Sequence, residues 1–306
     1  MGLFPKNLNE YVASMGVPRG PLSKTFFLDT VNGDDDNPGT TWQQPVKTLA
    51  AAEDLCTGDR HDAVLWLPGD TQDSVATTVS WDKDHTHLIG LGAPFPGIGQ
   101  RCRIASTAAA PALTISGRGG IFKNFQVQNT YAGASGGSLV SGPYNYFEGV
   151  YFNGMNNASS ANKSTSYCLS VTGAENYFRA CTVGSVQTAV SSTNAPLLIS
   201  NGANTFEKCR IQHYSETAGN FLVSLPAGTG GLSLLLFDGC VFFNQTVAWA
   251  TGSTDVFNIA QTGSHYVLLK DCIMIGATSW ADVVTHVYHD KAAPATGGGI
   301  AIAVNA

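Results

Sequence analysis

Apolar residues recur in this chain in a six-residue pattern that appears six times between residues 122 and 274. The pattern is an aromatic residue or Leu, two further residues, Cys or another apolar residue, one further residue, and a third apolar residue. The copies begin at intervals of 25, 31, 28, 31 and 32 residues, at Phe122, Phe147, Phe178, Phe206, Phe237 and Leu269. Self-similarity at intervals of this size is typical of proteins built from stacked structural repeats.

A second apolar run precedes each copy and predicts another strand in every repeat. These runs are ALTIS (112–116), SLVS (138–141), CLSV (168–171), LLIS (197–200), FLVSL (221–225) and VFNIA (256–260). Apolar alternation with a period of two indicates strands with one buried face. Turns rich in Gly, Asn or Pro join the paired strands, because these residues suit tight corners. Since no helix-length amphipathic pattern separates the strands, we predict an all-β, single-stranded parallel β-helix.

Equivalent positions of such a fold stack on successive coils about 4.8 Å apart. The predicted inward column is Phe125, Val150, Cys181, Cys209, Cys240 and Cys272. Free cysteine behaves as a small buried hydrophobe. A CxxC pair and metal-ligand spacing are absent, so we expect core packing and no cofactor or zinc site. Disulfides between coils remain an alternative, but unpaired cysteines fit synthesis in a reducing cytosol.

The N-terminal part predicts a cap for the coil. In FFLDTVNGDDDNPGTTWQQPVKTLAAA (26–52), Pro45 suits the first turn of a helix. Val46, Leu49 and Ala50 would form its apolar face, and Gly58 could end it. Such a helix would cover the core at the open end of the coil.

This segment and the repeat together resemble the pectin-lyase-like superfamily of right-handed parallel β-helices, over roughly residues 26–280. The resemblance implies a right-handed solenoid with an N-terminal capping helix. Among its members the chain looks most like non-enzymatic bacteriophage decoration or spike proteins. The superfamily also hosts lyases, hydrolases and adhesins, so the resemblance is specific for fold rather than for activity.

Four segments follow from this interpretation. Residues 1–25 form an N-terminal arm, either disordered or ordered only on a partner. Residues 26–60 hold the first strand and capping helix, and residues 61–280 form the β-helix. Residues 281–306 are a closing segment, whose short alternating run Ile300–Val304 could pair with its own coil or a neighbouring subunit.

The composition of the chain argues against two kinds of partner, nucleic acids and membranes. Charged residues make up 12% of the chain, the net charge is −6, and no Lys/Arg cluster occurs, which argues against nucleic-acid binding. The first residues lack the basic and apolar regions of a secretory signal, and no run of 18 apolar residues predicts a membrane span. We therefore expect synthesis in the host cytoplasm and no membrane contact.

One outward column could carry chemistry. The positions after the recurring aromatic are charged in all six copies: Lys123, Glu148, Arg179, Glu207, Asp238 and Lys270. Their signs mostly alternate, which predicts a surface ladder of ion pairs. Glu207 and Asp238 break the alternation, and two adjacent carboxylates could serve as the acid and nucleophile of a glycosidase. Lys208, Arg210 and Lys270 lie close enough in sequence to neutralise them, which favours a structural role and no catalytic site.

The acidic run at residues 34–36 is the candidate metal site, through Asp34 and Asp36. The D-x-D-x-D-G order of a calcium loop is not met. The run sits between Gly, Asn and Pro residues, so a solvated turn without a metal is favoured.

Three functions remain, of which the first is favoured. The chain could be a virion structural protein of a bacteriophage, a capsid decoration or spike. The resemblance then implies a homotrimer, docked on other virion proteins through the arm. Subunit contacts could come from Tyr144, Tyr146, Tyr151, Tyr177 and Trp280. The second function is a polysaccharide depolymerase, acting through Glu207 and Asp238.

The third function is a carbohydrate-binding adhesion module for a surface glycan. Its outward polar residues would be Gln126, Gln128, Tyr151, Asn153 and Gln212. Polar ladders of this kind are also ordinary β-helix surface.

Overall fold

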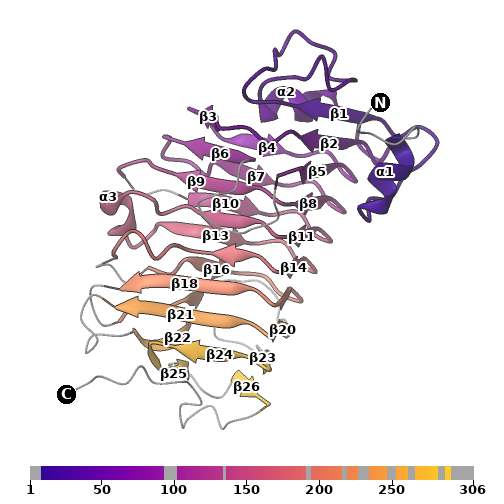
Figure 1. Ribbon diagram of the computed structural model, residues 1–306. Coiled ribbons are helices and arrows are strands. Elements are labelled where there is room, and N and C mark those ends of the chain that lie inside the picture. The colour runs from indigo at the N-terminus through magenta and orange to yellow at the C-terminus, as the bar shows by residue number, and fades with distance from the viewer. Residues whose placement is uncertain are drawn as a thin grey trace.

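A computed structural model shows the chain wound into one elongated stack of coils (Figure 1). It describes residues 8–92, 102–133, 136–190, 194–215, 219–226, 234–246, 253–260, 266–281 and 287–290. A complete coil contributes one strand to each of three sheets, and all strand pairs within the sheets are parallel. The predicted all-β parallel β-helix is therefore confirmed.

The sheets are called A, B and C in the order in which the chain enters them. Sheet A has ten strands: β1 (Thr25–Leu28), β2 (Ala63–Trp66), β5 (His87–Gly90), β8 (Ile121–Lys123), β11 (Tyr146–Glu148), β14 (Tyr177–Arg179), β17 (Thr205–Glu207), β20 (Leu234–Asp238), β23 (Tyr266–Lys270) and β26 (Val287–His289). Sheet B has eight: β3 (Asp73–Val75), β6 (Arg103–Ser106), β9 (Gln126–Asn129), β12 (Tyr151–Asn153), β15 (Thr182–Val183), β18 (Arg210–Ser215), β21 (Val241–Thr246) and β24 (Ile273–Ile275). Sheet C has eight: β4 (Val79–Trp81), β7 (Leu113–Ile115), β10 (Gly136–Val140), β13 (Tyr167–Val171), β16 (Leu197–Ile199), β19 (Val223–Leu225), β22 (Ser253–Ile259) and β25 (Ala277–Ala281). These counts cover the described residues.

The six-residue pattern spans two strands and the corner between sheets A and B. In the first copy, β8 ends at Lys123 and β9 starts at Gln126. The corner residue has a left-handed backbone in every copy: Asn124 (φ 56°), Gly149 (63°), Ala180 (49°), Lys208 (51°), Gly239 (64°) and Asp271 (51°). This residue turns the chain, so the next apolar side chain points inward three positions after the aromatic rather than two.

Two inward columns fill the interior. The rings of Phe122, Phe147, Phe178, Phe206 and Phe237 stack with centroids 5.0, 4.6, 4.6 and 4.9 Å apart. The predicted column from Phe125 to Cys272 is also buried, with every member at most 3% exposed. All seven cysteines are free and buried. Burial raises the pKa of the Cys168 thiol to about 11, so that thiol is protonated at neutral pH.

A column of buried asparagines ties the turns from sheet C to sheet A together. The side-chain oxygens of Asn145, Asn176 and Asn204 accept from the backbone N–H groups of Gly120, Asn145 and Asn176, at 2.7, 2.9 and 2.8 Å. Each oxygen thus accepts from a buried N–H group of the preceding coil. Leaving that donor without a hydrogen bond would cost about 1–3 kcal/mol.

The capping helix is α2 (Leu49–Leu55), which lies over the N-terminal end of the stack (Figure 1). Thr48 caps it by accepting from Ala51 N, and Leu49 and Ala52 reach the main core. The helix starts later than the sequence suggested. Val46 instead continues as extended chain and pairs with Leu28 in an isolated parallel bridge. Ala50, expected on the apolar face, is exposed because the helix presents Leu49 and Ala52 inward.

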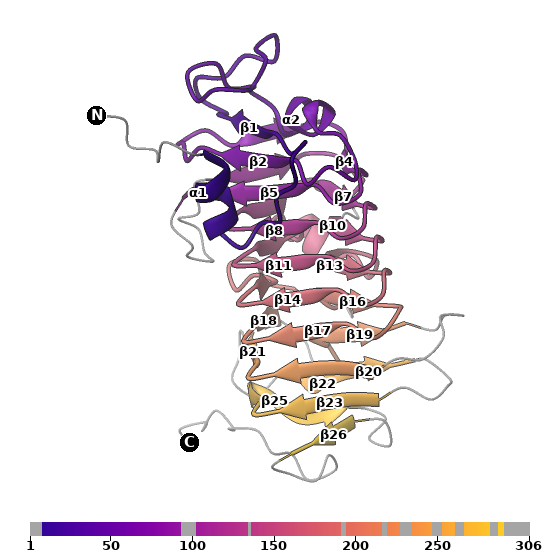
Figure 2. The ribbon, with the colours of Figure 1, turned by 90° about the vertical axis from the view of Figure 1, so that its right-hand side faces the viewer.

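The N-terminal arm is packed on the protein's own body from residue 8 onward. Helix α1 (Leu8–Ser14) lies against the outer face of sheet A beside β2, β5 and β8 (Figure 2). Val12 and Val17 form a small second core with Phe27, Leu65 and Ile89 of that face. The expectation that the arm is disordered or ordered only on a partner is therefore wrong for residues 8–25. Residues 1–7 lie outside the described part.

The remaining helix, α3 (Ala158–Ala161), is a single turn in the connection from sheet B to sheet C. No helix in the described residues is long and apolar enough to cross a membrane. In the closing segment, β25 ends at Ala281 and β26 adds a last strand to sheet A. The run at 300–304 lies outside the described residues.

Candidate functional site

The charged outward column forms the predicted ladder on sheet A. Strand register places its six members opposite one another in sequence order. Lys123 Nζ lies 2.9 Å from Glu148 Oε2, and Arg179 bridges Glu148 and Glu207 at 3.8 and 3.6 Å. Lys270 Nζ lies 2.7 Å from Asp238 Oδ2. The ladder of ion pairs expected from the alternating signs is present.

Glu207 and Asp238 are register partners on β17 and β20, as the sequence indicated. Each, however, has its own cation. Glu207 also lies 3.3 Å from Lys208 Nζ and accepts from the Tyr177 hydroxyl at 2.6 Å. The Tyr177 hydrogen bond, together with the nearby cations, lowers the pKa of Glu207. A general acid needs a raised pKa at this position, so the environment of Glu207 favours a permanently ionised structural carboxylate.

The acidic run at residues 34–36 is a turn that supports the start of α2. Asp35 Oδ1 accepts from the backbone N–H groups of Lys47 and Thr48, both at 2.8 Å. Asp34 Oδ1 accepts from Asp36 N at 3.1 Å, and both residues are exposed. Across the described residues, no three His, Cys, Asp or Glu side chains are placed to hold a metal ion.

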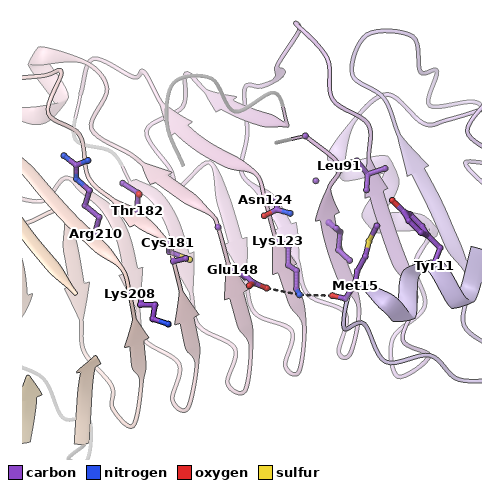
Figure 3. A pocket seen from close by; sticks show the side chains of 15 residues that line it. Tyr11, Met15, Leu91, Lys123, Asn124, Glu148, Cys181, Thr182, Lys208 and Arg210 are labelled. Atoms are coloured by element: carbon purple, nitrogen blue, oxygen red, sulfur yellow. Dashed lines mark hydrogen bonds and ion pairs between the residues drawn. The ribbon is translucent and has the colours of Figure 1, made fainter. Parts of the chain in front are cut away.

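A groove follows the corner between sheets A and B (Figure 3). Its volume is about 730 Å³. The sides are formed by the sheet A ladder and by the first residues of sheet B, and helix α1 lies at its N-terminal end. It extends from β5 to β17, four intervals of about 4.8 Å, or about 19 Å. We call it the corner groove, lined by Tyr11, Met15, Ile89, Gly90, Leu91, Gly92, Lys123, Asn124, Glu148, Gly149, Ala180, Cys181, Thr182, Lys208 and Arg210.

The corner groove carries more positive than negative charge, although the chain as a whole has a net charge of −6. Its lining has three basic residues, Lys123, Lys208 and Arg210, against the single carboxylate of Glu148. Glu148 is already paired with Lys123 and Arg179. Lys208 and Arg210 are exposed at the C-terminal end of the groove. A groove lined mainly by basic side chains attracts anionic ligands.

The floor of the groove is rigid backbone. The corner residues Asn124, Gly149 and Ala180 each donate a backbone N–H to the next coil, with N···O distances of 3.0, 3.1 and 2.9 Å. At Gly149 the left-handed backbone (φ 63°) favours glycine, and so does Asn124 Oδ1, which would lie only 2.8 Å from a Cβ atom at that position. Lateral hydrogen bonds therefore fix the floor, and a ligand would meet a preformed surface.

Aromatic residues expected at the surface divide into two groups. Tyr144 and Tyr177 are exposed, and the Tyr177 ring stacks on Tyr146 with centroids 5.8 Å apart. Tyr151 and Trp280 are buried, so they cannot form surface contacts as expected. Both lie on strands, and their side chains are covered by the surrounding chain.

The polar residues proposed for an open glycan surface on sheet B are mostly buried too. Gln126, Asn153 and Gln212 are at most 5% exposed, and only Gln128 of the polar set is partly exposed. Gln126 Oε1 and Asn153 Oδ1 have no hydrogen-bond partner. His213, a few residues beyond Glu207, is buried and 1% exposed. These residues do not line the corner groove.

Sequence reasoning found the ladder but missed the groove. Lys208 and Arg210 appeared only as neutralising neighbours of Glu207. The groove depends on Tyr11 and Met15, more than a hundred residues away from its other end, and no local pattern links them. A second arrangement that was missed is a cluster of three histidines, His61, His85 and His87, beside the start of β2 and β5.

Fold and groove together describe a parallel β-helix protein with a groove lined by basic side chains at one corner. No family model and no curated protein matches the chain. Among solved structures, it is similar to pectate lyase Pel9A, with 14% identity and a TM-score of 0.63, covering 90% of this chain and 69% of that one. A pectin methylesterase from carrot has 11% identity and a TM-score of 0.61, covering 94% and 91%.

A rhamnogalacturonan lyase is also similar, with 15% identity and a TM-score of 0.55, covering 82% of this chain and 68% of that one. All three share the parallel β-helix. At these identities the similarity shows the fold alone.

Proposed function

We propose that this chain is a structural protein of a bacteriophage virion, a capsid decoration or spike, that holds an acidic surface glycan in the corner groove without cleaving it. The observation that carries the proposal is the contrast between two sets of charges. The carboxylates of the sheet A ladder, Glu207 with Lys208 among them, are paired with cations, whereas the exposed Arg210 adds further positive charge to a preformed groove. Such a surface suits binding better than acid–base chemistry.

A spike or decoration has to keep its shape outside a cell, and the stack suits that task. Each coil hydrogen-bonds to the next through three sheets, and the Phe and Asn columns run through successive coils. Stability in such stacks is approximately a sum of terms for each coil and for each contact between neighbouring coils, so every added coil extends the same core and adds to stability. A homotrimer docked on other virion proteins remains part of the proposal.

The ligand class follows from the groove. Its open, elongated form of about 19 Å suits a polymer lying along the stack axis. Excess Lys and Arg suit carboxylate-bearing sugars, because charge-assisted hydrogen bonds contribute about 1.5–3 kcal/mol each. Asn124 and Thr182 offer neutral partners for hydroxyl groups.

Binding is tested by titrating the full chain with acidic oligosaccharides, such as oligogalacturonate, and with neutral oligosaccharides of equal length. We expect binding of the acidic series that weakens as salt increases. Lys208→Ala with Arg210→Ala should reduce affinity at least tenfold, the effect of about 1.4 kcal/mol. Lys270→Ala is the matched control, since Lys270 belongs to the ladder but lies outside the groove. Equal affinity of the double variant and the control would contradict the glycan site.

The virion role is tested in two ways. The first is the solution mass of the purified chain, from size-exclusion chromatography with light scattering. The second is incubation of the purified chain with phage particles that lack this protein. A mass near three times 32.1 kDa and recovery of the chain on particles are expected. A monomer that binds no particle would contradict the role.

The second candidate is a polysaccharide depolymerase, favoured by the fold shared with the pectate and rhamnogalacturonan lyases. If cleavage of any polysaccharide is detected, Glu207→Gln with Asp238→Asn should abolish it while circular dichroism stays unchanged. Cleavage that survives this double change removes the carboxylate pair from consideration.

A further inference from the structure

Three histidines meet where the chain enters β2 and β5. His61 Nδ1 lies 3.2 Å from His87 Nε2, and their rings are stacked with centroids 5.4 Å apart. His85 lies on the other side of His61, with ring centroids 5.5 Å apart. His85 Nδ1 in turn lies 2.8 Å from Asp59 Oδ1. His87 is fully buried, whereas His61 and His85 are partly exposed.

The hydrogen bonds of the cluster require a neutral His61. His87 Nδ1 accepts from the backbone N–H of Ile121 at 3.1 Å, so the proton of neutral His87 sits on Nε2. That proton is donated to His61 Nδ1. Adding a proton to His61 Nδ1 would set two N–H groups against each other and break the contact. The arrangement is therefore compatible with one protonation state of His61.

The backbone of the same histidine also binds the segment at residues 15–24, called the strap, which connects α1 to β1 within the N-terminal arm. Arg19 Nη1 donates to the His61 backbone oxygen at 2.9 Å, and Arg19 Nη2 donates to Thr25 Oγ1 at 3.0 Å. At the other end of the arm, Lys123 Nζ donates to Met15 O at 2.8 Å. Among residues 10–24 of the arm, whose burial the structure describes, Val12 and Val17 are the fully buried side chains. The arm is thus held by a small apolar contact and by polar contacts at Met15, Arg19, Ser23 and Lys24.

We propose that the imidazole cluster is a pH-sensitive latch for the N-terminal arm, which is released from sheet A when His61 takes up a proton. Charge on His61 breaks the bond from His87 and places two like charges, imidazolium and guanidinium, on either side of the His61 peptide. The hydrogen bond from Arg19 to the His61 backbone oxygen is then lost, and α1 separates from Phe27, Leu65 and Ile89.

The charged groups around His61 support this direction. Arg19 from the strap and His85 from the turn before β5 disfavour a charge on His61, and Asp59 favours it. Burial is the largest factor, and it lowers the pKa of His61. Asp62 offers little help, because its carboxylate is already occupied by Arg60, Thr57 N and Lys24 N. Burial and the charges of His61 and Arg19 also lower the pKa of His87 to about 3, so His87 stays neutral through the working range.

The sign of the pH dependence follows from this lowered pKa. When the arm leaves, His61 stays on the body but loses the cover and the positive charge that the arm supplies, so its pKa rises towards the ordinary value of about 6.5. The docked state binds fewer protons than the released state, so docking is fully stable above about pH 6.5 and weakens as the pH falls. Because Tyr11 and Met15 line the corner groove, release also opens its N-terminal end. This last consequence rests on the proposed glycan function, whereas the latch itself does not.

The latch is tested by hydrogen–deuterium exchange of the full chain at pH 7.5, 6.5 and 5.5, with labelling times scaled for the intrinsic pH dependence of exchange. Peptides covering 8–25 are compared with peptides covering 146–153, in the middle of the stack. We expect exchange in 8–25 to rise at least fivefold between pH 7.5 and 5.5, and exchange in 146–153 to stay constant.

His61→Asn is the diagnostic variant, because asparagine tolerates the left-handed backbone of position 61 (φ 58°) and does not titrate. It should make exchange in 8–25 independent of pH. Arg19→Ala should give high exchange in 8–25 at every pH, with an intact stack. His289→Gln, which changes a histidine at the other end of the stack, should behave as wild type.

Exchange in 8–25 that is constant with pH in the wild type, or that rises equally in His61→Asn, would overturn the latch. If His61→Asn fails to fold, a wild-type-like pH response in Arg19→Ala would overturn it instead. Glycan titration at pH 7.5 and 5.5 is a separate measurement. No binding at either pH would reject the proposed function and leave the exchange result standing.

Discussion

The two faces of sheet A are built from neighbouring residues of the same strands but follow different rules. The inward position is Phe in five consecutive coils, and its rings stack at nearly constant spacing. The outward position one residue later changes sign from Glu148 to Arg179 and back to Glu207. The interior repeats because each coil offers its neighbour the same space. The surface only has to match the residues above and below, so it is free to vary and to carry function.

The largest effect is expected from placing a charge at one of the inward, apolar positions of the coils. Val183 on β15 is fully buried, and Val183→Asp would place an unpaired carboxylate in the core. We expect a loss of several kcal/mol, enough to prevent folding. The measurement is soluble yield and thermal unfolding by circular dichroism. Arg210→Asp, exposed on the neighbouring strand β18, is the control and should change stability by less than about 1 kcal/mol. Soluble, cooperative folding of Val183→Asp would refute the assignment of the interior.

A direct comparison of the two faces uses adjacent residues of β14. Phe178→Ala removes a ring packed between Phe147 and Phe206 and should cost about 3–5 kcal/mol. Arg179→Ala removes an exposed member of the ladder and should cost about 0–1 kcal/mol. Chemical denaturation of both variants gives the two values. Similar losses would mean that the surface ladder contributes to the fold as the core does.

His213 is a buried titratable group whose contribution to stability depends on pH. Burial lowers the pKa of His213 to about 4, below the value of about 6.5 in an unfolded chain. The unfolded state therefore binds the proton first, and the contribution of His213 to stability is lost as the pH falls below about 6.5. Between pH 7 and 5 we expect a loss on the order of 2 kcal/mol from this residue. Denaturation of wild type and His213→Asn at both pH values isolates it, because the variant should lack this part of the slope.

The smallest expected effect concerns the two candidate catalytic carboxylates. Glu207→Gln with Asp238→Asn leaves Lys208 and Lys270 without partners on an exposed surface. Surface ion pairs contribute about 0–1 kcal/mol each, so thermal stability should change little. A loss of more than about 3 kcal/mol would show that the pair has a structural role beyond the ladder.

The sequence predicted most of the interior because its signals are local and repeated. The spacing from Phe178 to Cys181 to Val183 identified the inward side chains of one coil. It did not reveal that Ala180 turns a corner between two sheets, since alanine rarely adopts a left-handed backbone and gives no turn signal. The third strand of each coil therefore remained hidden. The start of α2 was placed too early because Pro45 suits a first helical turn, whereas pairing of Val46 with Leu28 keeps the chain extended there.

The functional surface was less predictable because it joins distant segments. Lys208 and Arg210 are a charged pair near Glu207 in the sequence, and only the coil geometry places them in line with Lys123. The latch depends on Arg19 reaching the backbone of His61, a contact that no periodic pattern encodes. The burial of Tyr151 was also invisible, because an aromatic residue near a turn reads as exposed until the covering chain is known.

The strand order has a consequence for how the protein is made. Each strand of sheet A from β2 to β23 pairs with the strands one coil before and one coil after it, and the α2 cap precedes the coils in the chain, so it is synthesised before them. A ribosome would therefore release the capped end before the later coils exist, and each new coil would find a finished template to build on. Stacked repeats can propagate structure from neighbour to neighbour in this way. The molecule can thus form by elongation from a seed, and its length can change by whole coils without redesigning the part already folded.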